Sequence, residues 1–271
     1  MLFKYSKLLK ISLFLFGTTL LYSETLRIMP LGDSITYDNK YGETRTDGER
    51  TGYRSFLWYK LTNAKYDVDF VGSQVAGQAV TPIFDPDNEG HPGWDSYDIA
   101  EKVLSYMNNS QPDIVLLHIG TNDRGSTSPE GVNLILDEID YYEQTTERKV
   151  KVIVALIINT KDNDGRIKIF NRRLNQLLVE RISSGDNIEI VDMYRGAGFT
   201  QSDFADRLHP SPSGYSKMAD VWFNALTEDK EEKDLYTYPY THIKKYYIES
   251  ITVEKNVVHY IANVPDSGIT F

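Results

Sequence analysis

Apolar residues along this chain follow two alternating patterns: short continuous runs, and longer stretches in which they recur every three or four positions. The run at 113–119 is nearly unbroken, which is typical of a parallel strand buried on both faces of a sheet. The longer stretches have amphipathic helical spacing, and Ser128-Pro129-Glu130 begins one with a hydroxyl cap and a proline in the first turn. Strands are predicted over 26–31, 68–71, 113–119, 150–158 and 188–191, and helices over 52–62, 96–107, 128–146, 166–183 and 213–226.

Five strands separated by helices predict successive βαβ units with right-handed crossovers. The expected fold class is therefore α/β, a three-layer α/β/α sandwich around a five-stranded parallel sheet. In such sheets, ligands bind beyond the carboxyl ends of the strands. Residues that carry chemistry are expected at that edge.

The two ends of the chain depart from this pattern. Three lysines precede an apolar run at 11–21, and Ser23 is a small residue just before the first acid. This order predicts a secretory signal peptide over 1–23, cleaved near Ser23, and a secreted or periplasmic protein. The run is shorter than the ~20 apolar residues that span a bilayer, so no stable membrane insertion is expected. The alternatives are a buried first helix and an uncleaved anchor.

The main domain is expected over 24–227, followed by a C-terminal extension over 228–271. The extension begins with a charge run at 228–234, which is typical of a solvated linker. Residues 236–271 are rich in Tyr, Ile and Val, with β-like patches near 248–253 and 257–262. Some 36 residues are too few for an independent fold. The segment is predicted to be a docked hairpin or the start of a further module.

Composition narrows the possible functions. Among 271 residues there are 29 Lys and Arg against 39 Asp and Glu, which gives a net charge of −10, and there is no cysteine. The missing thiols exclude disulfides, thiolate zinc sites, iron–sulfur clusters and a cysteine nucleophile. The acidic balance argues against nucleic acid as a partner.

Four short segments carry candidate chemistry. Ser34 follows the first predicted strand in Gly-Asp-Ser-Ile-Thr, and Asn122 follows the central strand in Gly-Thr-Asn-Asp. Both are therefore expected at the same sheet edge, where a side-chain amide can donate to an oxyanion. Asp206 precedes His209 by three residues, and a carboxylate so placed can hold an imidazole ready to accept a proton. Taken singly, each also fits a structural role: an N-cap serine, an Asx turn, a surface carboxylate and a satisfied histidine.

The fourth segment is a glycine-containing loop, Glu-Gly-His-Pro-Gly-Trp at 89–94, just before a predicted helix. Either of its glycines, Gly90 or Gly93, can offer an unobstructed backbone N–H. A plain loop with Trp94 packed on the core is the alternative.

Together and in this order, the four segments resemble those of the SGNH (GDSL) hydrolase superfamily, over about residues 26–226. Ile35 stands where the family usually has Leu. The resemblance implies a flavodoxin-like SGNH fold and a serine esterase without metal or organic cofactor. It implies Ser34 as nucleophile, His209 as general base, Asp206 as the acid that orients it, and an oxyanion hole formed by Ser34, Gly93 and Asn122, with Gly90 as the fallback for Gly93.

Residues 27–36, 52–54, 69–73 and 90–94 look most like the carbohydrate-esterase branch, which contains acetyl xylan esterases. This likeness implies an acylated small molecule or polysaccharide as substrate and O-acetyl groups as the groups that are removed. Arg54 and Trp94 are candidate substrate contacts; an ion pair at a helix start explains Arg54 equally well.

Other interpretations remain open at this stage. The alternatives are a lysophospholipase or thioesterase, an O-acetyltransferase and a non-catalytic surface-binding protein. A flavin or phosphate site is disfavoured, because the loop after the first strand lacks a phosphate cradle. Asp85-Pro86-Asp87 begins like an EF-hand loop but has Ser96 in place of the bidentate Glu. The acidic run from Asp162 likewise reaches Arg166 where a ligand is needed, so no metal is predicted.

Overall fold

The computed structural model describes residues 25–123, 125–228, 247–254 and 257–263. The chain divides after Thr227 into two compact units. The predicted signal peptide at 1–23 and most of the charge run at 228–234 lie outside the described residues. Among the described helices, none is both long enough and apolar enough to cross a bilayer.

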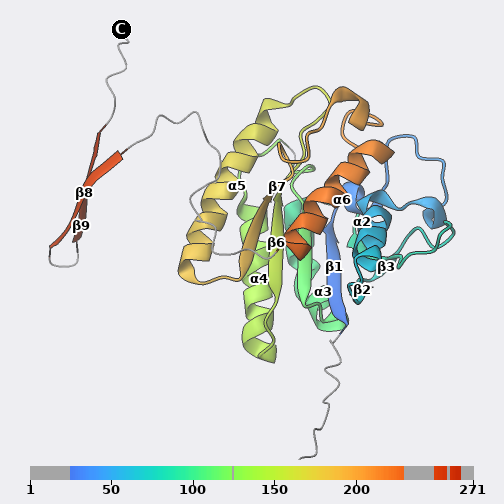
Figure 1. Ribbon diagram of the computed structural model, residues 1–271, viewed down its shortest axis with the longest axis horizontal. Helices are drawn as coiled ribbons and strands as arrows, with labels where there is room; N and C mark the ends of the chain where they lie inside the picture. The colour runs from blue at the N-terminus through green and yellow to red at the C-terminus, as the bar shows by residue number, and fades with distance from the viewer. Residues whose placement is uncertain (1–24, 124, 229–246, 255–256, 264–271) are drawn as a thin grey trace, which may run out of the picture. The chain divides into compact units, whose positions relative to one another are not determined.

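The first unit is a parallel sheet between two layers of helices (Figure 1). The sheet contains the five parallel strands that the hydrophobic runs predicted, in the order β2-β1-β5-β6-β7. Their bounds are β1 Leu26–Gly32, β2 Val68–Phe70, β5 Ile114–His118, β6 Lys151–Leu156 and β7 Ile188–Asp192. The long helices are α2 Gly52–Asn63, α3 Ser96–Ser110, α4 Glu130–Thr146, α5 Gly165–Ser184 and α6 Pro212–Thr227.

Two short strands extend this sheet beyond the five that were predicted. β4, Asp87–Gly90, pairs parallel with the end of β1, and β3, Gln74–Val75, pairs antiparallel with β4. The sequence did not predict these two additional strands, because neither has an apolar run. Polar burial holds β4 instead, since the fully buried Glu89 accepts hydrogen bonds from the Ser73 backbone N–H and hydroxyl at 2.7 and 2.6 Å.

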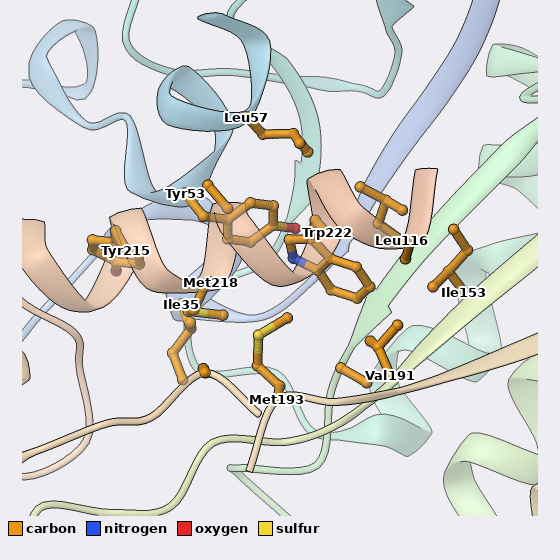
Figure 2. Packing of buried hydrophobic residues seen from close by; sticks show 14 of the residues in the cluster. Ile35, Tyr53, Leu57, Leu116, Ile153, Val191, Met193, Tyr215, Met218 and Trp222 are labelled. Atoms are coloured by element: carbon orange, nitrogen blue, oxygen red, sulfur yellow. The ribbon is translucent and has the colours of Figure 1, made fainter. Parts of the chain in front are cut away.

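One face of the sheet packs against α2 and α6. The buried cluster there contains Ile28, Leu116 and Ile153 from the strands and Trp222 from α6, with no member from α3, α4 or α5. Figure 2 shows Trp222 between the helices and the strands. On the other face α4 and α5 are joined by Arg181, which donates to the carboxylates of Asp137 and Asp140.

The second unit contains two antiparallel strands, β8 Tyr247–Glu254 and β9 Val257–Asn263. They fall on the two β-like patches that the sequence predicted in the C-terminal extension. The residues predicted to turn between them, 255–256, lie outside the described residues.

Candidate active site

Strand register brings the carboxyl ends of three strands to one level. Gly32, the last residue of β1, pairs with Gly90 of β4 on one side and with His118 of β5 on the other. The segments that follow therefore leave the sheet together; they carry Ser34, Gly93 and Asn122. A Cβ at position 32 would lie 2.3 Å from the His118 carbonyl oxygen, so only glycine permits this close approach.

Ser34 begins a single helical turn, α1 Ser34–Tyr37, directly after β1. Asp33 caps this turn, because its Oδ1 accepts the Ile35 backbone N–H at 2.9 Å. The next side chain, Ile35, is fully buried and lies with Met193 and Met218 in the core beneath the site (Figure 2). The Asp33 hydrogen bond and the buried Ile35 side chain together fix the position of Ser34, which is 8% exposed.

A chain of hydrogen bonds links Ser34 to a carboxylate through one imidazole. Ser34 Oγ lies 3.0 Å from His209 Nε2, and His209 Nδ1 lies 2.8 Å from Asp206 Oδ2. His209 Nδ1 faces the carboxylate, which assigns its proton there and leaves Nε2 to accept the Ser34 proton. The structure thus brings Ser34 into contact with His209, which lies 175 positions later in the sequence, and with the Asp206 that holds it. This is the geometry of an activated serine nucleophile.

The two carboxyl groups near Ser34 have opposite environments. Burial raises the pKa of Asp33 to about 7, although the Ile35 N–H opposes this. Burial also raises the pKa of Asp206, but hydrogen bonds from His209, Leu208 and Tyr41 outweigh it, so the net shift is downward. Asp206 therefore stays ionised over the whole neutral range, as a group that stabilises an imidazolium must be.

The loop that carries Asp206 and His209 is fastened at its base by Asp203. The buried Asp203 carboxylate accepts from Thr200, from Ser213 and, at 2.7 Å, from Lys217 on α6. Burial raises the pKa of Asp203, but these hydrogen bonds outweigh it and hold the pKa well below its usual range. The loop is thus tied to the last helix by an ionised group.

Protonation of Asp203 at low pH is expected to weaken its hydrogen bonds to the loop and to α6. The folded-state pKa of Asp203 lies below its unfolded value of about 4, so its contribution to stability is present above that pH and is lost as the pH falls through the folded-state pKa. Asp203→Asn is expected to lower the free energy of unfolding by about 2 kcal/mol at pH 7, with the difference shrinking toward pH 2. Urea unfolding at both pH values measures this; a difference that is equal at both would contradict it.

Tyr41, on the loop after α1, lies against the imidazole, a contact that the sequence does not predict. Its backbone N–H donates to Asp206 Oδ2 at 3.0 Å, and its exposed ring meets the His209 ring edge-on at 5.3 Å between centroids. The loop is held by Asp38, which binds the Arg45 guanidinium and accepts the backbone N–H groups of Thr51 and Gly52. Only the three-dimensional structure reveals this contact, because nothing in the spacing of Tyr41 points to it.

The structure distinguishes the two glycines of the 89–94 loop. The Gly90 N–H is buried and donates to Asn88 Oδ1 at 3.0 Å. Gly93 is exposed, has a φ of 85° and would meet nothing within 4 Å if it carried a Cβ. Within the described residues its N–H has no acceptor, so Gly93 rather than Gly90 has a donor to offer. Asn122 Nδ2 donates to the Trp94 carbonyl at 2.9 Å, which joins the amide to the same loop and leaves its second N–H for another acceptor.

A buried pair, Glu89 and His91, holds this loop from below. Glu89 Oε1 lies 2.6 Å from His91 Nε2, and the His91 backbone N–H donates to the Gly32 carbonyl at 2.9 Å. The imidazole is stacked between Trp94 and Tyr106, with ring centroids 4.3 and 5.1 Å away. The loop that presents Gly93 is thus fixed by one short hydrogen bond and two ring faces.

His91 is therefore expected to position Gly93 without touching substrate. His91→Leu should lower kcat about 10- to 100-fold with KM within about twofold, because small misplacements of an oxyanion donor act on the transition state. Ser73→Ala removes another partner of Glu89 but leaves the loop intact, and it serves as the control. Equal losses in the two variants, or a change confined to KM, would contradict this role for His91.

The prediction that Arg54 contacts substrate is wrong. Its side chain is fully buried on α2, and its guanidinium makes five hydrogen bonds. Every N–H is used on a main-chain carbonyl, so none is left for a substrate or for the ion pair that was the alternative. Sequence could not reveal this, because the acceptors are backbone atoms. They belong to Thr36, Tyr37, Arg50, Ala76 and Pro86.

Trp94, the other candidate substrate contact, is half-buried beside the Gly93 loop. One face of its ring packs on His91. Because its ring is only partly buried, Trp94 stays a candidate for substrate contact and also supports the loop.

His118 is a second buried histidine near the site, at the end of β5. Its Nε2 accepts the Ile158 backbone N–H at 3.3 Å, and burial lowers its pKa to about 4. The ring is therefore neutral at physiological pH and engaged with the backbone. It is His209 whose ring meets Ser34.

The two acidic loops that resembled metal sites have protein partners. Asp85 accepts the backbone N–H groups of Phe70 and Asp87, and Asp162 binds Thr160 and Arg207. Among the described residues, no group of three or more His, Cys, Asp or Glu side chains is arranged to hold a metal ion.

Comparison with known families agrees with this geometry. The family model of the GDSL-like lipases and acylhydrolases matches residues 28–222, which includes all four segments that carry the site. The chain belongs to this family. It is accordingly a hydrolase that acts on ester bonds.

Individual relatives are moderately similar. The multidomain esterase of Ruminococcus flavefaciens is 28% identical over 231 residues, which cover 74% of this chain and 28% of that protein. The chain thus corresponds to little more than a quarter of that relative's length.

Two solved structures share the fold at higher identity. The family 3 carbohydrate esterase of Clostridium thermocellum superimposes with a TM-score of 0.64 and 31% identity, over 74% of this chain and 94% of that one. An acetyl esterase mutant with an acetate ion gives a TM-score of 0.62 and 30% identity, over 74% and 96%.

Proposed function

We propose that this GDSL hydrolase is an exported serine esterase that removes O-acetyl groups from carbohydrate. The observation that carries the proposal is the contact chain from Ser34 Oγ through His209 to Asp206, at 3.0 and 2.8 Å, beside the Gly93 loop. The names of the two structural relatives, a family 3 carbohydrate esterase and an acetyl esterase, support the substrate class. The signal-like segment at 1–23 supports export.

The first half of the reaction forms an acyl-enzyme. Ser34 Oγ attacks the acetyl carbonyl carbon as His209 Nε2 takes its proton, and the carbonyl oxygen becomes an oxyanion. The N–H groups of Ser34 and Gly93 and the Asn122 amide stabilise that charge. The imidazolium, held by Asp206, then gives its proton to the departing sugar oxygen, which leaves as a free hydroxyl.

The second half regenerates the enzyme. His209 accepts a proton from a water molecule as the water oxygen attacks the acetyl-Ser34 ester. The tetrahedral intermediate collapses to acetate, and Ser34 recovers the proton from His209. His209 accepts and returns one proton in each half of the reaction, so these steps balance without a metal ion or a redox reaction.

Nitrophenyl esters from acetyl to dodecanoyl, together with acetate release from acetylated xylan, test the acyl and substrate classes. The proposal expects kcat/KM to be highest for acetyl and acetate to be released from the polysaccharide. A maximum at long acyl chains would assign the chain to a lipase-like activity instead. Transfer of the acetyl group to an added sugar in preference to water would identify a transferase.

A further inference from the structure

A second surface feature lies on the carboxyl side of the sheet, beyond β6 and β7. It is a cleft of about 460 Å³ between the loop that follows β6 and the segment that follows β7. Its volume falls in the range of small-ligand sites. None of its residues takes part in the contact chain of Ser34.

This cleft shares a wall with the loop that carries the catalytic candidates. Phe204, which lines the cleft, is bridged to Pro210, and between them the Ala205 N–H donates to the His209 carbonyl at 2.8 Å. From the opposite wall, the Lys161 N–H donates to the Arg207 carbonyl at 2.9 Å. Both walls are thus hydrogen-bonded to the segment 205–209, so a ligand in the cleft is next to the loop that activates Ser34.

The lining combines half-buried aromatic rings with polar side chains. Tyr194 and Phe199 supply the rings, and Phe199 is braced edge-on by Phe204 at 5.2 Å between centroids. Asn159 and Gln201 supply amides. A pyranose ring has an apolar C–H face and a rim of hydroxyl groups, which an aromatic ring and amides match respectively.

The polar groups of the cleft are held in place before any ligand arrives. Asn159 Nδ2 donates to Asn163 Oδ1 at 3.0 Å, and Gln201 Nε2 donates to the Lys161 carbonyl at 2.6 Å. The Gln201 side-chain oxygen remains as an acceptor for hydroxyl groups, and Asn159 Oδ1, which accepts the Thr160 backbone N–H at 2.9 Å, keeps one lone pair for the same purpose. In the described part of the chain the Lys161 ammonium has no carboxylate partner, so it is available as a donor. Pre-ordered groups lower the entropic cost of binding.

We propose that this cleft is a binding subsite for a pyranose unit of the glycan whose ester Ser34 cleaves. The inference rests on the proposed function and adds to it the place where the carbohydrate is held. A sugar unit bound here positions the chain, while a neighbouring acetylated unit reaches Ser34. A fatty acyl chain does not fit the same lining, since amides and an ammonium interrupt its apolar surface.

The test compares a glycan substrate with a small ester on the same variants. Phe199→Ala and Lys161→Met are measured with acetylated xylohexaose and with 4-nitrophenyl acetate. Each is expected to lower kcat/KM on the oligosaccharide about tenfold, the equivalent of one lost aromatic or polar contact, and to change it less than twofold on the small ester. The control Lys168→Met removes an exposed ammonium on α5 outside the cleft and should change neither.

Binding without turnover gives a second readout. Deacetylated xylohexaose titrated into Ser34→Ala should bind, and the added Phe199→Ala change should weaken that binding by a similar factor. Unchanged oligosaccharide kinetics, or equal losses on both substrates, would overturn the subsite and leave the esterase proposal standing. Wild-type enzyme that cleaves 4-nitrophenyl acetate but no acetylated oligosaccharide would overturn the carbohydrate proposal itself, and the subsite with it.

Discussion

Ser34→Ala is expected to lower kcat for 4-nitrophenyl acetate by at least about 10³-fold, with the fold unchanged. Removing the nucleophile of a triad leaves only transition-state stabilisation by the remaining donors. The oxygen that is lost has His209 Nε2 as its partner, at 3.0 Å. The backbone N–H of residue 34 survives the change, so the oxyanion donors persist.

Two further variants make this result specific. His209→Ala should cost as much as Ser34→Ala, and the double variant should cost no more than either alone, because the two residues act as one unit. Ser128→Ala, which removes a partly exposed hydroxyl before α4, is the matched serine control. Ser34→Ala enzyme with activity near that of the wild type, in a preparation free of host esterases, would contradict the role of Ser34.

Arg54→Met is expected to lower the free energy of unfolding by at least about 4 kcal/mol, a loss that few substitutions reach. The guanidinium donates to five main-chain carbonyls, and a thioether leaves those acceptors unpaired. Burial lowers the pKa of Arg54 to about 10, so the side chain stays charged at neutral pH. Two of the acceptors, Thr36 and Tyr37, belong to the helical turn of Ser34, so this residue also supports the nucleophile.

Chemical unfolding at pH 7 measures this loss. Arg173→Met is the control, because Arg173 is exposed and its contacts are with Thr127 on the surface; its cost should stay within about 0.5 kcal/mol. Arg54→Lys keeps the charge but has three donors on one nitrogen, and should recover part of the loss. An Arg54→Met protein as stable as the Arg173→Met control would show that the five hydrogen bonds contribute little.

The sequence carries the main architecture because burial on both faces leaves a visible trace. The strands β1, β5 and β6 are recognisable from their apolar runs, and α3 from its periodic spacing. Each of these elements must remove a continuous apolar surface from water. β4 leaves no such trace, because Glu89 and Asn88 are buried by hydrogen bonds rather than by apolar contact. Polar burial depends on partners distant in sequence and cannot be read from local pattern.

The same distinction applies to the site. Asp206 and His209 lie on one loop, so their contact follows from spacing alone. The choice between Gly90 and Gly93 needed the Asn88 side chain, which occupies the Gly90 N–H. The misassignment of Arg54 has the same origin, because an arginine near a catalytic segment has an identical sequence signature whether it faces substrate or five backbone carbonyls.

Covalent labelling is the most direct test of Ser34 as the nucleophile. Wild-type enzyme is incubated with a fluorophosphonate, and the labelled peptide is identified by mass spectrometry. We expect one adduct, on Ser34, formed in step with loss of esterase activity and absent from His209→Ala, because the imidazole activates the hydroxyl. Full inactivation with the label on any other residue, or an active enzyme that takes no label, would contradict it.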